Sequence, residues 1–109
     1  MEIHERLALV YQRLRDLPPA RTAEEALHQL DTTLTKVEDE HSGVPFNPNA
    51  GLASDGRMYF PREDFTTRHP DGSVTALTKG QVITAQPNGE LTITSRRTGE
   101  VVYHRPGAK

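Results

Sequence analysis

Residues 70–107 read PDGSVTALTKGQVITAQPNGELTITSRRTGEVVYHRPG, and this stretch decides the fold. Five glycines divide it at spacings of 8, 9, 10 and 8 residues, namely Gly72, Gly80, Gly89, Gly99 and Gly107. The first four are each followed by a polar and then an aliphatic residue. Pro-Asp-Gly at 70–72 and Pro-Asn-Gly at 87–89 are turn signals, because Gly tolerates positive φ and Pro restricts φ on the approach. The stretch therefore predicts short antiparallel strands joined by tight turns.

The segments between these turns have the residue pattern of half-buried strands. In 90–95, Leu91 and Ile93 alternate with Thr92 and Thr94, which places the two kinds of side chain on opposite faces. We predict strands at 73–79, 81–86, 90–96 and 100–105, and shorter ones at 57–60 and 65–69. Residues 57–109 are thus expected to form a four- to five-stranded antiparallel meander with one solvent-exposed face.

Upstream of the strands, apolar residues recur every three or four positions, which is the spacing of one stripe along an amphipathic helix. Pro18 and Pro19 end the first such segment, and Thr22 with Glu25 forms a capping box that begins the second. Gly43 suits the C-terminal cap of the second segment. The pattern predicts helices at 2–17 and 23–42, and their short connection predicts an antiparallel hairpin.

The 109 residues are expected to form a single α+β domain, with the helical hairpin, a flexible loop at 44–56 and then the sheet. The core is thin, because Leu, Ile, Val and Phe number only 23. Each helical stripe is as narrow as a coiled-coil seam. We therefore expect a homodimer in which a second copy packs on the hairpin through its apolar stripes: Ile3, Leu7, Val10, Leu14, Leu27, Leu30, Leu34 and Val37.

The composition also excludes several classes of site. Cysteine is absent, so disulfides, thiolate metal sites and cysteine nucleophiles are excluded. No His-x3-His or His-Glu-x-x-His spacing occurs, and we expect neither a metal nor a cofactor. The chain has no signal-peptide pattern and no apolar run of about 20 residues, so we expect a soluble, cytoplasmic protein with no membrane contact.

The distribution of charge does not favour a dedicated nucleic-acid binder. After Gly56, eight Lys and Arg face five Asp and Glu, a net charge of +3, whereas residues 1–56 carry a net charge of −5. This difference permits contact with phosphate but falls short of the basic stripe of a nucleic-acid-binding protein.

Residues 57–65 form the most unusual local string, because aromatic, Met and Arg side chains are interleaved there as in interface hot spots. We predict that these residues contact a protein partner: Arg57, Met58, Tyr59, Phe60, Arg62 and Phe65. The same aromatic residues are equally suited to plug the space between hairpin and sheet. Together with the stripes, this segment predicts a small, non-enzymatic interaction or assembly protein of bacterial type that self-associates through its hairpin.

Two alternatives stay open at this point. If the strands at 65–69 and 100–105 were neighbours, His69 and His104 could cleave RNA without a metal, helped by Arg96 and Tyr103. The order of two helices before a sheet is also similar to that of the ribonuclease toxins of bacterial conflict systems. The second alternative is a subunit of a phage or secretion spike, because Gly-led repeats of about eight residues resemble the β-helical needles of such spikes.

Overall fold

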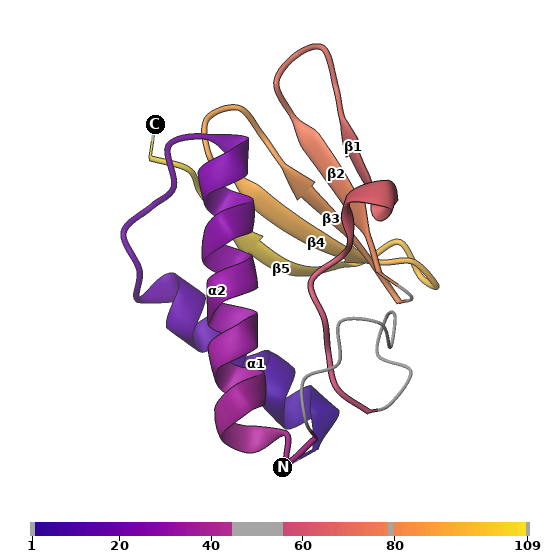
Figure 1. Ribbon diagram of the computed structural model, residues 1–109. Helices are drawn as coiled ribbons and strands as arrows, with labels where there is room; N and C mark the ends of the chain where they lie inside the picture. Colours follow the sequence, from indigo (N-terminus) through magenta and orange to yellow (C-terminus); the bar gives the residue numbers. More distant parts are fainter. Residues whose placement is uncertain (1, 45–55, 79, 109) are drawn as a thin grey trace.

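The computed structural model of the protein describes residues 2–44, 56–78 and 80–108. It is an α+β fold with two helices followed by a five-stranded antiparallel sheet, as the sequence predicts (Figure 1). Helix α1 spans Ile3–Arg15 and helix α2 spans Ala23–His41. A short 3₁₀ helix η1 (Glu63–Phe65) leads into the strands, which are β1 (Thr66–Arg68), β2 (Val74–Leu77), β3 (Gln81–Ala85), β4 (Leu91–Ser95) and β5 (Val101–Arg105).

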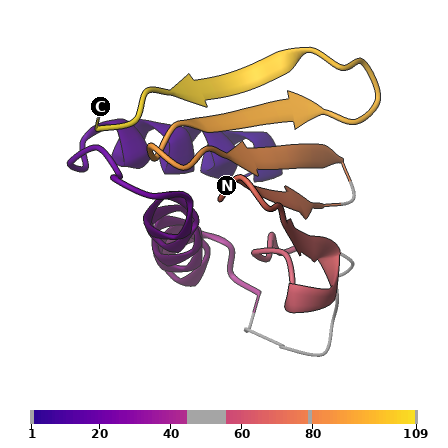
Figure 2. The same cartoon turned by 90° about the horizontal axis from the view of Figure 1, so that it is seen from above.

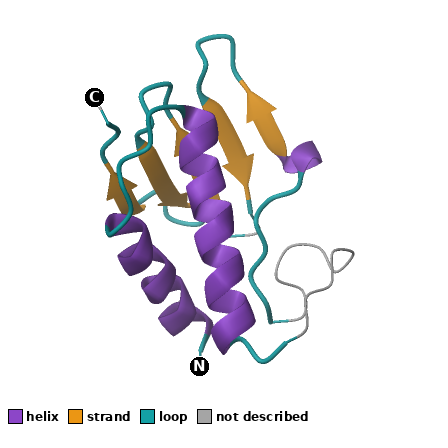
Figure 3. Cartoon of the chain, turned by 60° about the vertical axis from the view of Figure 1, so that its left-hand side comes forward, coloured by secondary structure: helices purple, strands orange, loops and turns teal. Residues whose placement is uncertain are grey.

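The sheet is a meander in which each strand pairs with the next along the chain, so β1 and β5 are its two edges. A β-helical needle is therefore not the architecture of this chain. Both helices lie on the same face of the sheet (Figure 3). In Figure 2, α1 is seen behind β3 and β4. The rings of Tyr11 in α1 and Tyr103 in β5 are stacked at 4.5 Å between centroids.

The apolar stripes of both helices are buried against the chain's own sheet. Six of the eight predicted dimerisation residues are at most 8% exposed, namely Val10, Leu14, Leu27, Leu30, Leu34 and Val37. Two narrow stripes on adjacent helices combine into one surface wide enough to cover a sheet face. Only Ile3, which is 43% exposed, and the half-buried Leu7 leave part of the stripe accessible to a second copy. Self-association stays a prediction.

The predicted strand at 57–60 is wrong, and the sheet begins at Thr66. The amide of Met58 donates its hydrogen bond to the Glu38 carboxylate of α2, at 2.7 Å, and not to a neighbouring strand. Phe65, predicted as the start of a strand, belongs to η1. Residues 45–55 of the predicted loop lie outside the described residues.

At one end, the hairpin and the sheet are in backbone contact, and we call this the closed end. Gly89 has a φ of +92°, and a Cβ added there would lie 1.9 Å from the carbonyl oxygen of Ala20. The amide of Ala108 donates to the same oxygen at 2.9 Å. The buried guanidinium of Arg105 donates to the carbonyl oxygens of Leu17 and Pro18 at 2.7 and 2.6 Å. These contacts fix the end of β5 to the connection between the helices.

Candidate functional site

An apolar groove of about 330 Å³ lies between the hairpin and the sheet, at the end where α1 begins. Its walls come from both helices, from the segment 58–61 and from the β2–β4 part of the sheet. The described residues that line it are Ile3, Leu7, Tyr11, Leu30, Leu34, Met58, Tyr59, Phe60, Pro61, Thr78, Gly80, Gln81, Ile83 and Ile93. Its size is at the lower end of the roughly 300–1,000 Å³ that is usual for ligand pockets.

The helical wall of the groove follows from the spacing of α1. Ile3, Leu7 and Tyr11 are four residues apart, so their side chains lie on one face of the helix. Farther along α1, Val10 and Leu14 are fully buried, whereas Leu7 and Tyr11 keep part of their surface exposed. The helical stripe is therefore closely packed toward the closed end and only partly covered at the groove.

The few polar groups among the described lining residues of the groove are uncharged. Gln81 donates from Nε2 to the hydroxyl oxygen of Tyr11 at 3.1 Å. Burial raises the pKa of Tyr11 above its usual value, and the hydrogen bond with Gln81 opposes this rise in part. Tyr11 is thus neutral at physiological pH, and the groove favours an apolar occupant.

Residues 56–61, which we call the connecting segment, are fastened to both helices by buried ionic groups. Arg6 of α1 and Glu38 of α2 form an ion pair with 2.5 Å between Nε and Oε1, and they are 3% and 1% exposed. Arg6 also donates to the carbonyl oxygen of Gly56 at 2.6 Å. The other Glu38 oxygen accepts the amide of Met58. Removing one partner from such a buried pair costs about 3–5 kcal/mol, so the segment is firmly held.

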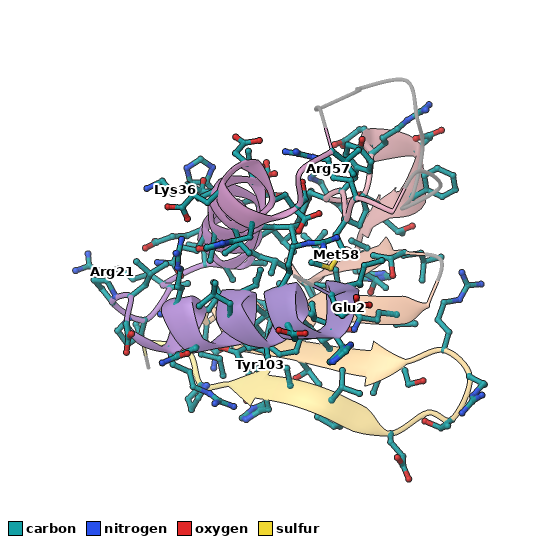
Figure 4. The ribbon with its side chains drawn as sticks, turned by 90° about the horizontal axis from the view of Figure 1, so that it is seen from below. Glu2, Arg21, Lys36, Arg57, Met58 and Tyr103 are labelled. Atoms are coloured by element: carbon teal, nitrogen blue, oxygen red, sulfur yellow. The ribbon has the colours of Figure 1, made fainter. Side chains whose placement is uncertain are left out.

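The predicted partner-binding residues divide into three groups. Met58, Tyr59 and Phe60 line the groove. Arg57 is 2% exposed and holds the connecting segment, with hydrogen bonds to Asp39 and to the carbonyl oxygen of Val44. Figure 4 shows Met58 pointing into the space between the helices and the sheet, whereas Arg57 lies toward the end of α2.

Arg62 and Phe65, the remaining two predicted residues, are exposed and lie outside the described lining of the groove. Arg62 pairs with Asp64 at 3.4 Å between Nη2 and Oδ2. Their place beyond Pro61 separates them from the described wall of the groove, and a role of Arg62 and Phe65 in binding a partner stays a prediction.

A second, charged pocket of about 190 Å³ lies on the other side of Phe60 and Pro61. Its other described lining residues are Glu24, Leu27, His28, Asp31, Glu63, Thr66 and Arg68. Arg68 pairs with Glu24 at 2.8 Å and with Glu63. The hydrogen bond that Arg68 donates to Glu24, followed by the one that it donates to Glu63, raises the pKa of Arg68. The sequence predicts no such pocket, although Glu24, His28 and Asp31 are spaced to share one face of α2.

The two histidines of the ribonuclease alternative are not neighbours. The ring nitrogen Nε2 of His69 lies 2.8 Å from Oγ1 of Thr75 in β2, whereas His104 lies in β5. From Thr75 the register across the sheet runs through Thr84 and Thr92 to His104, which is three strand spacings or about 14 Å. The condition for their joint action is therefore not met.

Arg96 and Tyr103, the other two residues of that alternative, are also apart. Tyr103 is 3% exposed on the helix-covered face of the sheet, opposite to the face of its neighbour His104. Arg96 follows the end of β4, where its side chain donates to the carbonyl oxygen of Thr78 at 2.9 Å. His104 instead contacts Glu90, with 3.2 Å between Nε2 and Oε2. The four groups are not brought to one site.

Within residues 2–44, 56–78 and 80–108, no three His, Asp or Glu side chains are grouped so that they could hold a metal ion. No helix in the described part of the chain has the length and apolar character needed to cross a membrane. Comparison with known protein families, curated proteins and solved structures finds no match to this chain.

Proposed function

We propose that this chain is a non-enzymatic protein-interaction module, which binds a partner protein by taking a large apolar side chain of the partner into the apolar groove. The observation that carries this proposal is the lining of the groove. Both helices, the connecting segment and the sheet contribute to it, and the residues are nearly all apolar. It includes Met58, Tyr59 and Phe60, which the sequence singles out as hot-spot residues.

The energetics suit an apolar anchor. Burying a Leu, Phe or Met side chain is worth about 1.5–3 kcal/mol, and a few such anchors supply most of the free energy of many interfaces. The buried ion pair of Arg6 and Glu38 fixes the wall formed by the connecting segment. A preformed wall reduces the entropic cost of ordering the site when the partner binds.

Three further parts of the proposal rest on the sequence. These are a bacterial origin, a cytoplasmic location and a homodimer, which we expect because the core is thin. With six stripe residues buried in their own chain, the hairpin offers a second copy Ile3 and Leu7. The groove and a hairpin dimer therefore compete for the same two side chains.

The experiment selects binders to the immobilised full chain from a random peptide library and measures their affinity by fluorescence anisotropy. Selected peptides are expected to carry a large apolar residue whose change to Ala abolishes binding. Ile3→Ser is expected to weaken binding about tenfold, because about 1.4 kcal/mol of apolar contact is lost.

Leu17→Ser is the matched control, since Leu17 is 37% exposed and lies near the other end of the hairpin, beyond α1. It should leave the affinity unchanged. Failure to select any peptide, or equal effects of the two variants, would overturn the proposed function.

A further inference from the structure

The apolar groove and the charged pocket share one wall. Phe60 and Pro61 line both, and α2 supplies residues to both. Leu30 and Leu34 face the groove, whereas Glu24, His28 and Asp31 lie on another side of α2 and face the charged pocket. A partner segment anchored in the groove thus lies within a few residues of the charged pocket.

The charged pocket favours a cation. Three carboxylates and one guanidinium are among the described residues that line it, and their formal charges sum to −2. The guanidinium of Arg68 is already bonded to two of the carboxylates, Glu24 and Glu63. Asp31 accepts one long hydrogen bond, of 3.5 Å, from the hydroxyl of Thr35. An acidic partner residue would meet like charges here, whereas a basic one would find carboxylate oxygens.

We propose that the partner segment carries an Arg or Lys next to its apolar anchor, and that this basic residue contacts the carboxylates of the charged pocket. The inference rests on the proposed function, because the anchor in the groove is what brings the cation to the pocket. The planar guanidinium of Arg matches carboxylate geometry better than the ammonium of Lys, so Arg is the preferred residue.

The exposure of the pocket sets the size of the effect. The side chains of Glu24 and Glu63 are 60% and 79% exposed, so water and salt screen them. Exposed charges contribute more to association rate and to discrimination than to affinity. The basic residue is therefore expected to change the affinity severalfold, and less at high salt.

The test uses the peptides selected on the full chain. Their sequences are expected to show Arg or Lys within a few positions of the apolar anchor. Changing that basic residue to Ala should weaken binding to the wild-type chain about threefold to tenfold. The same change should have little effect on binding to Asp31→Asn/Glu63→Gln, because that variant lacks two of the carboxylates.

Glu100→Gln is the matched control, since Glu100 is an exposed acid in the turn between β4 and β5. Changing the basic residue of the peptide to Ala should weaken binding to Glu100→Gln as much as it weakens binding to the wild-type chain. One outcome would overturn this inference and leave the proposed function standing. In that outcome the selected peptides lose affinity for Ile3→Ser, which shows that they bind through the groove, but their sequences have no preference for a basic residue beside the anchor, or prefer an acidic one. If no peptide is selected, both fail.

Discussion

The two ends of the contact between hairpin and sheet are built in different ways. At the closed end, the backbone of Gly89 touches that of Ala20, and Arg105 is bonded to the carbonyl groups that follow α1. At the groove end, side chains separate the two layers, and the ion pair of Arg6 with Glu38 holds the connecting segment in place. One continuous helical stripe thus gives a sealed core at one end and a groove at the other.

The closed end stabilises the fold, whereas the groove end offers a surface that can bind a partner. Backbone contact at the closed end needs glycine, since any Cβ at position 89 would collide with Ala20. The groove end depends on buried charges, which are costly to desolvate unless they are paired. Substitutions at the closed end should therefore change stability alone, whereas those at the groove end should also change binding.

The largest expected effect is that of Gly89→Ala. The added Cβ meets a backbone oxygen at 1.9 Å, and the position has a positive φ. We expect the free energy of unfolding, measured by urea denaturation, to fall by about 5 kcal/mol. Gly99→Ala is the control, because Gly99 has a φ of +77° with nothing within 4 Å of the added Cβ. It should cost only about 1–2 kcal/mol, and an equal cost at both positions would contradict the backbone contact.

The next effect is that of Glu38→Gln at the groove end. We expect a loss of about 3 kcal/mol in the free energy of unfolding, because Arg6 loses its buried counter-charge while Gln can still accept the amide of Met58. The double variant Arg6→Met/Glu38→Gln should recover most of this loss, since no charge then remains buried at the pair and the amide of Met58 keeps its acceptor.

Glu40→Gln provides the matched control for the buried pair. Glu40 pairs with Arg13 between the same two helices at 2.6 Å, but both side chains are well exposed. The Glu40→Gln variant should unfold at the same urea concentration as the wild-type chain. If Glu38→Gln is as mild as Glu40→Gln, the connecting segment is not held by the buried pair.

A smaller effect on stability is expected from filling the groove. Leu7 is half-buried in its wall, and Leu7→Phe should raise the free energy of unfolding by about 0.5–1 kcal/mol while lowering the affinity for selected peptides at least tenfold. Leu9→Phe is the control on the same helix, because Leu9 is half-buried but lies outside the described lining. If Leu7→Phe binds the selected peptides with unchanged affinity, the peptides do not bind in the groove.

The smallest effect is a pH dependence in the turn between β1 and β2. Ser73 donates two hydrogen bonds to the Asp71 carboxylate, first from its hydroxyl and second from its amide, and these lower the pKa of Asp71. A lowered folded-state pKa gives stability that is present above the unfolded value of about 3.9 and is lost as the pH falls through the folded value. Thermal unfolding below about pH 4 should therefore show a slightly steeper loss of stability in the wild-type chain than in Asp71→Asn. Parallel curves would contradict this contribution.

The elements of the fold are predictable because their signals are local. The N-cap half of the capping box predicted from Thr22 and Glu25 is present, since the hydroxyl oxygen of Thr22 accepts the amide of Glu25 at 3.1 Å. The Glu25 carboxylate accepts a hydrogen bond from the amide of Arg21, at 3.4 Å, one residue before the N-cap. Gly72 and Gly89 have positive φ in the turns where the sequence places them. The prediction of a strand at 57–60 fails for a non-local reason, because a strand-like composition does not reveal that Glu38, on a helix 20 positions away, accepts the amide of Met58.

The site is less predictable because it depends on contacts between distant residues. Arg6 and Glu38 are 32 positions apart. The sequence pattern predicts that each side chain is exposed to solvent beside an apolar stripe. The composition of residues 57–65 singles out Met58, Tyr59 and Phe60. The groove that these three residues line, however, depends on the distances between both helices, the connecting segment and the sheet. Periodicity indicates which residues face the core, but it does not indicate how closely the layers approach.

The most direct test of the central claim is a methyl NMR titration of the full chain with a selected peptide. We expect the methyl resonances of Ile3, Leu34 and Met58 to shift, because all three residues line the groove. Val102, which is 46% exposed on β5 and lies outside the described lining, should not shift. Shifts at Val102 without shifts at Ile3, Leu34 and Met58 would contradict the assignment of the groove as the binding site.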